Sequence, residues 1–146
     1  MKNLTAQVEK SIHASPSEVW RALTTASTLK NFFFGADIET DWKLGSPIRM
    51  KGEFNGKKYE DKGDILEIEA QRCLSFSHWS AMAGQPDKRE YYHIVTFELA
   101  PDGQKTKVTL SQANLTGAVT AADLAHRADY EKNWSGVLDG LARLFT

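Results

Sequence analysis

The sequence predicts an α+β fold in which a curved antiparallel sheet is closed by one long C-terminal helix. Three observations carry this prediction. Apolar and polar residues alternate over residues 4–12, which is typical of a half-buried strand. The same alternation dominates residues 48–112, and from about Ala121 the apolar period becomes helical. A single amphipathic helix must bury its apolar stripe against one face of the sheet.

The first strand leads into a short helix with a strong start signal. Ser15 can accept a hydrogen bond from the first helical turn, Pro16 suits the first helical position, and Glu18 completes a capping box. A second helical segment is expected over residues 27–33, with Gly35 as its stop. The sequence therefore predicts two short helices after the first strand.

The central strands are separated by recognisable turns. Asn55-Gly56 is a strong signal for a two-residue hairpin turn between a strand ending at Phe54 and one over residues 57–69. Gly63 within the second of these strands indicates a bulge or a bend. Later strands alternate through residues 74–78, 91–99 and 108–112. We expect Pro101-Asp102-Gly103 to form the tight turn between the last two strands.

The final helix presents one apolar face to the rest of the protein. That face contains Tyr130, Trp134, Val137, Leu138, Leu141 and Phe145. Sequential hairpins give an antiparallel sheet, and strong curvature leaves a gap between sheet and helix. Gaps of this kind often hold small-molecule sites.

Composition favours one soluble domain over residues 1–146. The net charge of -1 gives no field that would attract nucleic acid. No apolar run is long enough for membrane insertion, and the N-terminus lacks the apolar core of a signal peptide. Cys73 is the single cysteine, which fits a reducing compartment. We therefore expect a cytoplasmic protein.

Several segments resemble the Hsp90 ATPase activator homologue family of the START/Bet v 1-like superfamily. The stretch from Trp42 through Gly45 to Ile48 is similar to the family's Trp-x-x-Gly-Gly-x-Phe segment, with Ser46 in place of the second glycine. Further similar segments are Leu74-Ser-Phe76-Ser-His-Trp79, Val95-Thr-Phe97-Glu-Leu99, Thr106-Lys-Val108-Thr-Leu110, and Trp134 with Leu138 and Leu141.

The resemblance covers nearly the whole chain and implies a helix-grip fold. In that fold a curved antiparallel sheet of about six or seven strands wraps the long C-terminal helix, and two short helices close one end. It also implies a cavity between sheet and helix, and it raises contact with a chaperone or a homodimer as partner hypotheses.

The polar residues in phase with inward-facing apolar ones are the best site candidates. His78 shares its strand face with Phe76, His93 with Val95, and Gln112 with Leu110. An imidazole in a cavity could bind, orient or protonate a ligand near neutral pH. The alternative is that each histidine is a hydrogen-bonded core residue or lies at a solvated strand end.

Other candidates for the cavity wall are aromatic or flexible apolar residues, each of which could equally be ordinary core. They are Phe32, Phe33, Met50, Phe54, Phe76, Tyr91, Tyr130 and Trp134. No nucleophile elbow, phosphate loop, His-Glu-x-x-His motif or cysteine pair is present. We assign no catalytic residue, metal ligand or cofactor from the sequence.

Three functional hypotheses follow. The leading one is non-catalytic binding of a small apolar or amphipathic molecule between sheet and helix. The second is a cyclase, dehydratase or hydrolase that uses His78 or His93 as general acid or base, which requires one ring inside the cavity with an orienting partner. The third is a chaperone-cofactor-like interaction protein, which an exposed apolar patch on the outer sheet face would favour.

Overall fold

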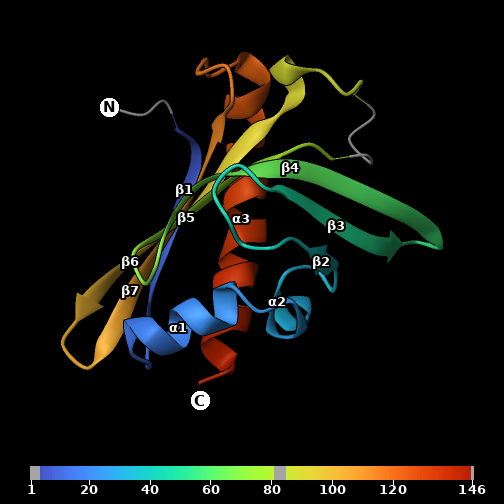
Figure 1. The fold of residues 1–146 in the computed structure, drawn as a ribbon. Helices are drawn as coiled ribbons and strands as arrows, with labels where there is room; N and C mark the ends of the chain where they lie inside the picture. Colours follow the sequence, from blue (N-terminus) through green and yellow to red (C-terminus); the bar gives the residue numbers. More distant parts are fainter. Residues whose placement is uncertain (1–3, 81–84, 146) are drawn as a thin grey trace.

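A computed structural model describes residues 4–80 and 85–145 of the chain, with the side chain of Phe54 outside the description. The described residues form a seven-stranded antiparallel sheet in the order β1-β7-β6-β5-β4-β3-β2. Its strands are β1 (Leu4–Ile12), β2 (Asp37–Glu39), β3 (Pro47–Phe54), β4 (Lys57–Glu69), β5 (Cys73–His78), β6 (His93–Asp102) and β7 (Lys105–Asn114). The sheet curves around the long helix α3 (Ala121–Arg143), as Figure 1 shows. The predicted helix-grip architecture is confirmed.

Two short helices follow β1, as the sequence predicts. They are α1 (Pro16–Leu23) and α2 (Ala26–Phe32). The capping box is present, because Ser15 Oγ accepts from the Glu18 backbone N–H at 3.2 Å and Glu18 Oε1 accepts from the Ser15 backbone N–H at 3.3 Å. Both helices lie against one end of the sheet beside α3 (Figure 1).

Helix α3 joins the sheet through two different kinds of contact. Its C-terminal half buries the predicted apolar stripe, including Val137, Leu138 and Leu141. Its N-terminal half is more exposed and is tied to β1 by Arg127, which donates hydrogen bonds to the carbonyls of Leu4 at 2.8 Å and Thr5 at 2.9 Å. The apolar turns therefore anchor the helix, and polar contacts fix the direction of its other end.

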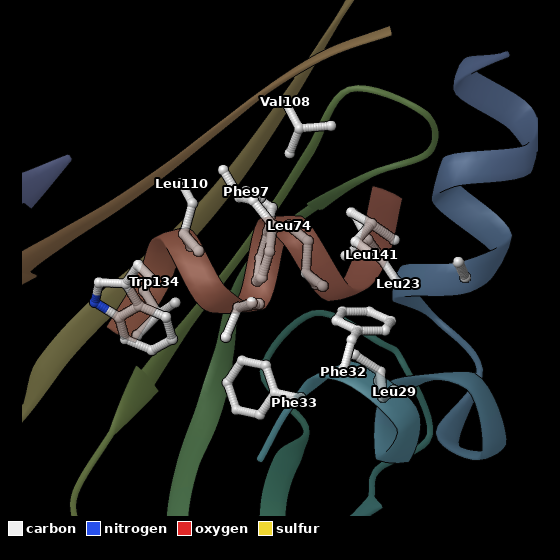
Figure 2. Packing of buried hydrophobic residues seen from close by; sticks show 14 of the residues in the cluster. Leu23, Leu29, Phe32, Phe33, Leu74, Phe97, Val108, Leu110, Trp134 and Leu141 are labelled. Atoms are coloured by element: carbon white, nitrogen blue, oxygen red, sulfur yellow. The ribbon is translucent and has the colours of Figure 1, made fainter. Parts of the chain in front are cut away.

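The core fills the space between the closing helices and the sheet. Figure 2 shows Phe32 and Leu29 of α2 and Leu141 of α3 facing Leu74 and Phe97 from the sheet. Gly140 allows α2 to approach α3 closely, because a Cβ at this position would lie 2.7 Å from the Cβ of Phe32. This close packing leaves the larger open space at the other end of α3.

The β3–β4 hairpin turns at Asn55-Gly56, as predicted, and both residues have positive φ angles, of 51° and 79°. Gly63 pairs regularly with Ile48, so the register change in β4 does not occur at this glycine. It occurs two residues later, between Ile65 and Glu67. β4 thus pairs with β3 along its first part and with β5 along its last part.

Gly63 serves instead as a point of close approach between backbones. A Cβ at this position would lie 1.6 Å from the carbonyl oxygen of Ser77 on β5. The hydroxyl of Ser77 also accepts a hydrogen bond from the Asp64 backbone N–H at 2.9 Å. β4 and β5 can therefore approach this closely only because residue 63 lacks a side chain.

Two local predictions differ from the structure. The β6–β7 turn lies at Gly103 and Gln104, because the strands remain paired through Asp102 and Lys105, beyond the predicted Pro101-Asp102-Gly103 turn. Strand β2 was not predicted, since three residues are too few to display alternation. It pairs with β3 through Ile38 and Met50 and forms one edge of the sheet.

Candidate functional site

A pocket of about 580 Å³ lies between the sheet, α3 and the segment that follows α2. This volume falls within the range common for small-molecule sites. Its wall is formed by Phe33, Phe34, Ala36, Met50, Glu53, Tyr59, Asp61, His78, Ser80, His93, Gln112, Tyr130, Asn133 and Trp134. Phe34 and Glu53 are exposed, so they mark the side on which the pocket meets solvent.

One side of the pocket is an aromatic wall, which we define as Phe33, Phe34, Tyr130 and Trp134. The rings of Phe33 and Phe34 each lie 5.9 Å from the Trp134 ring, between centroids. Phe33 and Trp134 come from α2's end and from α3, and Figure 2 shows them side by side. The Phe33 and Phe34 rings are tilted by 40° and 58° from the Trp134 ring, so together they present apolar ring faces and edges against which another ring can pack.

Phe34 has an unusual backbone conformation for an aromatic residue. Its φ angle is 57°, and 57% of its surface is exposed. A non-glycine residue in the left-handed region costs roughly 1–2 kcal/mol. Phe34 contacts Phe33 and Trp134 but gains little burial, so its strained conformation positions a ring at the pocket rim.

The other side of the pocket is a polar row, which we define as Asp61, His78, His93 and Gln112. Each residue comes from a different strand, from β4 to β7 in sheet order. His78 and His93 are direct partners across β5 and β6. The pocket therefore places aromatic surface opposite a line of hydrogen-bonding groups.

The Asp61–His78 pair is the most ordered part of the polar row. Asp61 Oδ2 lies 3.0 Å from His78 Nε2, and both side chains are largely buried. A carboxylate only accepts hydrogen bonds, so a neutral His78 carries its proton on Nε2 and its lone pair on Nδ1. Nδ1 has no hydrogen-bond partner among the residues that the structure describes.

His93 stays uncharged near neutral pH. Burial lowers the pKa of His93, His78 beside it lowers that pKa further, and Asp123 acts in the opposite direction. The ring also lies 6.2 Å from the ring of Tyr130, between centroids. A neutral imidazole can both donate and accept a hydrogen bond toward a ligand.

The two tyrosines of the pocket remain protonated. Burial raises the pKa of Tyr59, and Asp61 raises it further. Burial likewise raises the pKa of Tyr130, with added contributions from Asp123 and Asp129. Both hydroxyls are therefore neutral hydrogen-bonding groups and supply no negative charge.

Gln112 provides an unpaired donor inside the pocket. Its side-chain Oε1 accepts a hydrogen bond from the indole Nε1 of Trp134 at 2.8 Å, which fixes the orientation of the amide. The other amide atom, Nε2, is buried and has no partner among the described residues. The residue is only 4% exposed. A buried donor without a partner costs about 1–3 kcal/mol, and a ligand oxygen would remove that cost.

Seven of the residues selected from the sequence lie on the pocket wall. They are Phe33, Met50, His78, His93, Gln112, Tyr130 and Trp134. Phe32 and Phe76 are buried in the packed core and do not line the pocket, and the Phe76 ring packs behind the wall at 6.4 Å from the Phe33 ring, between centroids. The side chain of Phe54 lies outside the described residues. That these groups bind a ligand stays a prediction.

Tyr91 lies outside the pocket. The alternation over residues 91–99 predicts that Tyr91 and His93 share one face of a strand that contains both residues. The structure instead has a 3-10 turn, η2 (Arg89–Tyr91), and β6 begins only at His93. Tyr91 is 36% exposed and does not line the pocket.

Asp61 is the functional candidate that the sequence interpretation missed. Asp61 alternates in phase with Gly63 and Ile65 in the sequence, but the bulge that Gly63 indicates would turn its side chain outward. Since the register holds across Gly63, Asp61 points inward and is 9% exposed. Among the described residues, no group of three or more His, Cys, Asp or Glu side chains could hold a metal ion.

The fold and the pocket together define a helix-grip protein with a pocket between sheet and helix that opens to solvent on one side. The family model described as "Activator of Hsp90 ATPase homolog 1-like protein" matches residues 13–146. The chain belongs to this family. No match to a curated protein was found.

Solved structures share this fold over almost the full chain. A protein named ChR145 from Cytophaga hutchinsonii is 40% identical, with a TM-score of 0.77 and coverage of 95% of this chain and 91% of that one. The Aha1 dimer from Colwellia psychrerythraea is 21% identical, with a TM-score of 0.70 and coverage of 96% of this chain and 94% of that one. CalU16 from Micromonospora echinospora is 22% identical, with a TM-score of 0.71 and coverage of 96% and 74%.

The described part of the chain contains no helix with both the length and the apolar character needed to cross a bilayer.

Proposed function

We propose that this protein binds a small, flat, amphipathic molecule in the pocket between sheet and helix. The observation that carries the proposal is the buried and unpaired Nε2 of Gln112. An amide donor that faces a pocket and lacks a partner is satisfied when a ligand supplies a carbonyl, hydroxyl or ether oxygen. The ligand is therefore expected to carry an oxygen at one edge.

The two sides of the pocket determine the shape of this ligand. The aromatic wall favours a ring system, which would stack against Trp134 and Phe33. The polar row offers Gln112 as a donor, and His78 Nδ1 as an acceptor. We accordingly expect a fused-ring or similarly flat molecule with oxygen groups on the edge that faces the strands.

The test compares two bicyclic probes that differ by one oxygen. Purified protein is titrated with 2-naphthol and with naphthalene, and binding is followed by ligand fluorescence. The expected result is that 2-naphthol binds about tenfold more tightly, because its oxygen accepts from Gln112. In the Gln112→Leu variant the preference for 2-naphthol should fall to about threefold or less.

Gln104→Leu is the matched control, because Gln104 is exposed in the β6–β7 turn and does not line the pocket. It should leave the preference for 2-naphthol unchanged. Absence of binding by both probes, with folded protein verified by circular dichroism, would contradict the proposal.

Family membership also supports a second candidate, a chaperone-cofactor-like or homodimeric interaction protein. The Aha1 structure from Colwellia psychrerythraea, which is 21% identical to this chain, is described as a dimer. The large exposed hydrophobic residues lie on separate segments: Phe34, Leu44, Leu66, Tyr91, Leu124 and Leu144. Because these side chains do not gather on one element, ligand binding remains the better-supported role. Under either role we propose a cytoplasmic location.

A further inference from the structure

We propose that the pocket also catalyses enolisation of a ketone ligand, with His78 as the base and Gln112 as the donor to the carbonyl oxygen. This inference rests on the proposed binding function and adds a reaction to it. The substrate class is a flat apolar ketone with an acidic C–H next to the carbonyl. Three features of the polar row carry the argument.

The first feature is an oriented base. His78 Nε2 is bound to Asp61 Oδ2 at 3.0 Å, so the lone pair of the neutral ring is on Nδ1. The same arrangement holds a histidine in its reactive tautomer in other acid–base sites, where the carboxylate also stabilises the imidazolium that forms. Asp61 is thus a positioning residue, and His78 is the group that would touch the substrate.

The second feature is a fixed donor for the oxygen that gains charge. The Trp134 indole holds Gln112 Oε1 at 2.8 Å, and the rigid amide therefore directs Nε2 away from that contact. Nε2 is buried and has no partner in the described residues, so no internal bond must break before it binds a carbonyl. Preorganised donors in sites shielded from water stabilise a developing negative charge most effectively.

The third feature is the spacing of the two groups. His78 and Gln112 lie on β5 and β7, with β6 between them. His78 pairs with His93, whereas Gln112 pairs with Val95, two residues further along β6. Two strand spacings and this two-residue offset separate the backbones by roughly 12 Å, which side chains that lean into the pocket from both strands reduce to the span of a bicyclic ligand. His93 lies between them and is held neutral by burial, so it adds no cation that would attract the enolate away from Gln112.

The reaction is balanced without any further reagent. The Nδ1 lone pair of His78 takes the proton, and the electron pair of the broken C–H bond forms the C=C bond of the enolate. The carbonyl π electrons move to oxygen, which accepts a hydrogen bond from Gln112 Nε2. The imidazolium exchanges its proton with water, which the partly exposed His78 ring allows, and returns a hydron to carbon.

The experiment measures hydrogen–deuterium exchange in 2-tetralone, a bicyclic ketone with acidic C–H groups beside its carbonyl. Proton NMR in D2O follows the loss of the signal of these hydrogens with and without the protein. We expect the protein to accelerate exchange at least roughly 100-fold over buffer at the same pH, since positioned bases contribute on this order. Binding of 2-tetralone is measured separately by displacement of 2-naphthol.

Variants then assign the roles. His78→Gln should remove nearly all of the acceleration, and Gln112→Leu should reduce it by roughly 10- to 100-fold. Asp61→Asn should lower the exchange rate at saturating 2-tetralone by at least roughly tenfold while the dissociation constant changes less than twofold. A purely structural role for Asp61 would weaken binding as well. Circular dichroism verifies that each variant is folded.

His13→Gln is the matched control for the loss of an imidazole, because His13 is exposed outside the pocket. It should exchange 2-tetralone at the wild-type rate. If 2-tetralone binds without accelerated exchange, or His78→Gln keeps the wild-type rate, enolisation is wrong and the binding function stands. If neither 2-tetralone nor 2-naphthol binds, both proposals are wrong.

Discussion

The indole Nε1 of Trp134 donates a hydrogen bond of 2.8 Å to the side-chain oxygen of Gln112, and this bond joins the closing helix to β7 inside the pocket. Trp134 is 8% exposed and Gln112 is 4% exposed. One contact therefore contributes to two properties, the attachment of α3 to the sheet and the orientation of the unpaired amide donor.

Replacement of Trp134 by phenylalanine should destabilise the protein by about 1–3 kcal/mol, because Gln112 then loses the partner of its buried oxygen. Urea unfolding monitored by circular dichroism measures the change. Trp20→Phe is the control, since Trp20 is half-buried and its indole nitrogen has no hydrogen-bond partner recorded among the described residues. Equal destabilisation by both variants would contradict a specific role for the Trp134–Gln112 bond.

Gly63→Ala should be among the most damaging single changes in the sheet, at about 3 kcal/mol or more. Its Cβ would fall 1.6 Å from the Ser77 carbonyl oxygen, so the backbones of β4 and β5 must separate. The matched variant is Gly136→Ala on α3, where a Cβ meets no atom within 4 Å. That change should stabilise the protein by about 0.5–1 kcal/mol, because alanine favours the helix.

If chemical unfolding instead gave similar stabilities for the two glycine variants, the close approach of the β4 and β5 backbones at Gly63 would have no energetic importance.

Asp123→Ala should lower the stability by about 2 kcal/mol near neutral pH, because the carboxylate caps α3 and also binds Asn114. Its Oδ2 accepts from the Thr120 backbone N–H at 2.8 Å and from Asn114 Nδ2 at 2.7 Å. Burial raises the pKa of Asp123, but the hydrogen bonds from Thr120 and Asn114 outweigh it and the net pKa is lowered.

A lowered carboxyl pKa fixes the direction of the pH dependence. The unfolded chain binds a proton at higher pH than the folded chain, so the stabilisation by Asp123 is complete above about pH 4 and is lost as pH falls through the folded pKa. The stability difference between wild type and Asp123→Ala should shrink on acidification below that point. Asp129→Ala, at an exposed position on α3, should give a small difference at every pH.

Phe34→Gly should separate pocket function from stability. Glycine accepts the φ angle of 57° without steric cost but loses more backbone entropy on folding, so the net change in stability should stay within about 1 kcal/mol. Loss of the ring removes part of the aromatic wall, and 2-naphthol should bind roughly 3- to 10-fold more weakly. Fluorescence titration and urea unfolding measure the two effects. A large loss of stability with unchanged binding would reverse this interpretation of Phe34.

The sequence predicted half of the residues on the pocket wall because the alternation of its strands is kept in the structure. His78, His93 and Gln112 were selected from strand phase alone, and all three line the pocket. The phase is reliable there because β5, β6 and β7 pair without a register change over these residues. The helix face around Trp134 was similarly readable from its 3.6-residue period.

The parts that could not be predicted depend on contacts between distant segments. Asp61 is not among the residues selected from the sequence, because the bulge predicted at Gly63 would turn it outward. Gly63 instead makes room for the carbonyl oxygen of Ser77 on the neighbouring strand. Tyr91 was misplaced because alternation does not reveal where a strand begins. The role of Phe34 depends on its positive φ angle, which the local sequence does not indicate.

The unpaired amide of Gln112 has a consequence for the amount of protein in a cell. Under the proposed binding function, the buried donor without a partner makes the empty protein less stable than the ligand-bound one, and stability rises with ligand concentration. Since the unfolded fraction of a protein is subject to proteolysis, a cell that lacks the ligand would retain less of this protein. Supply of the small molecule would then set the abundance of its own receptor.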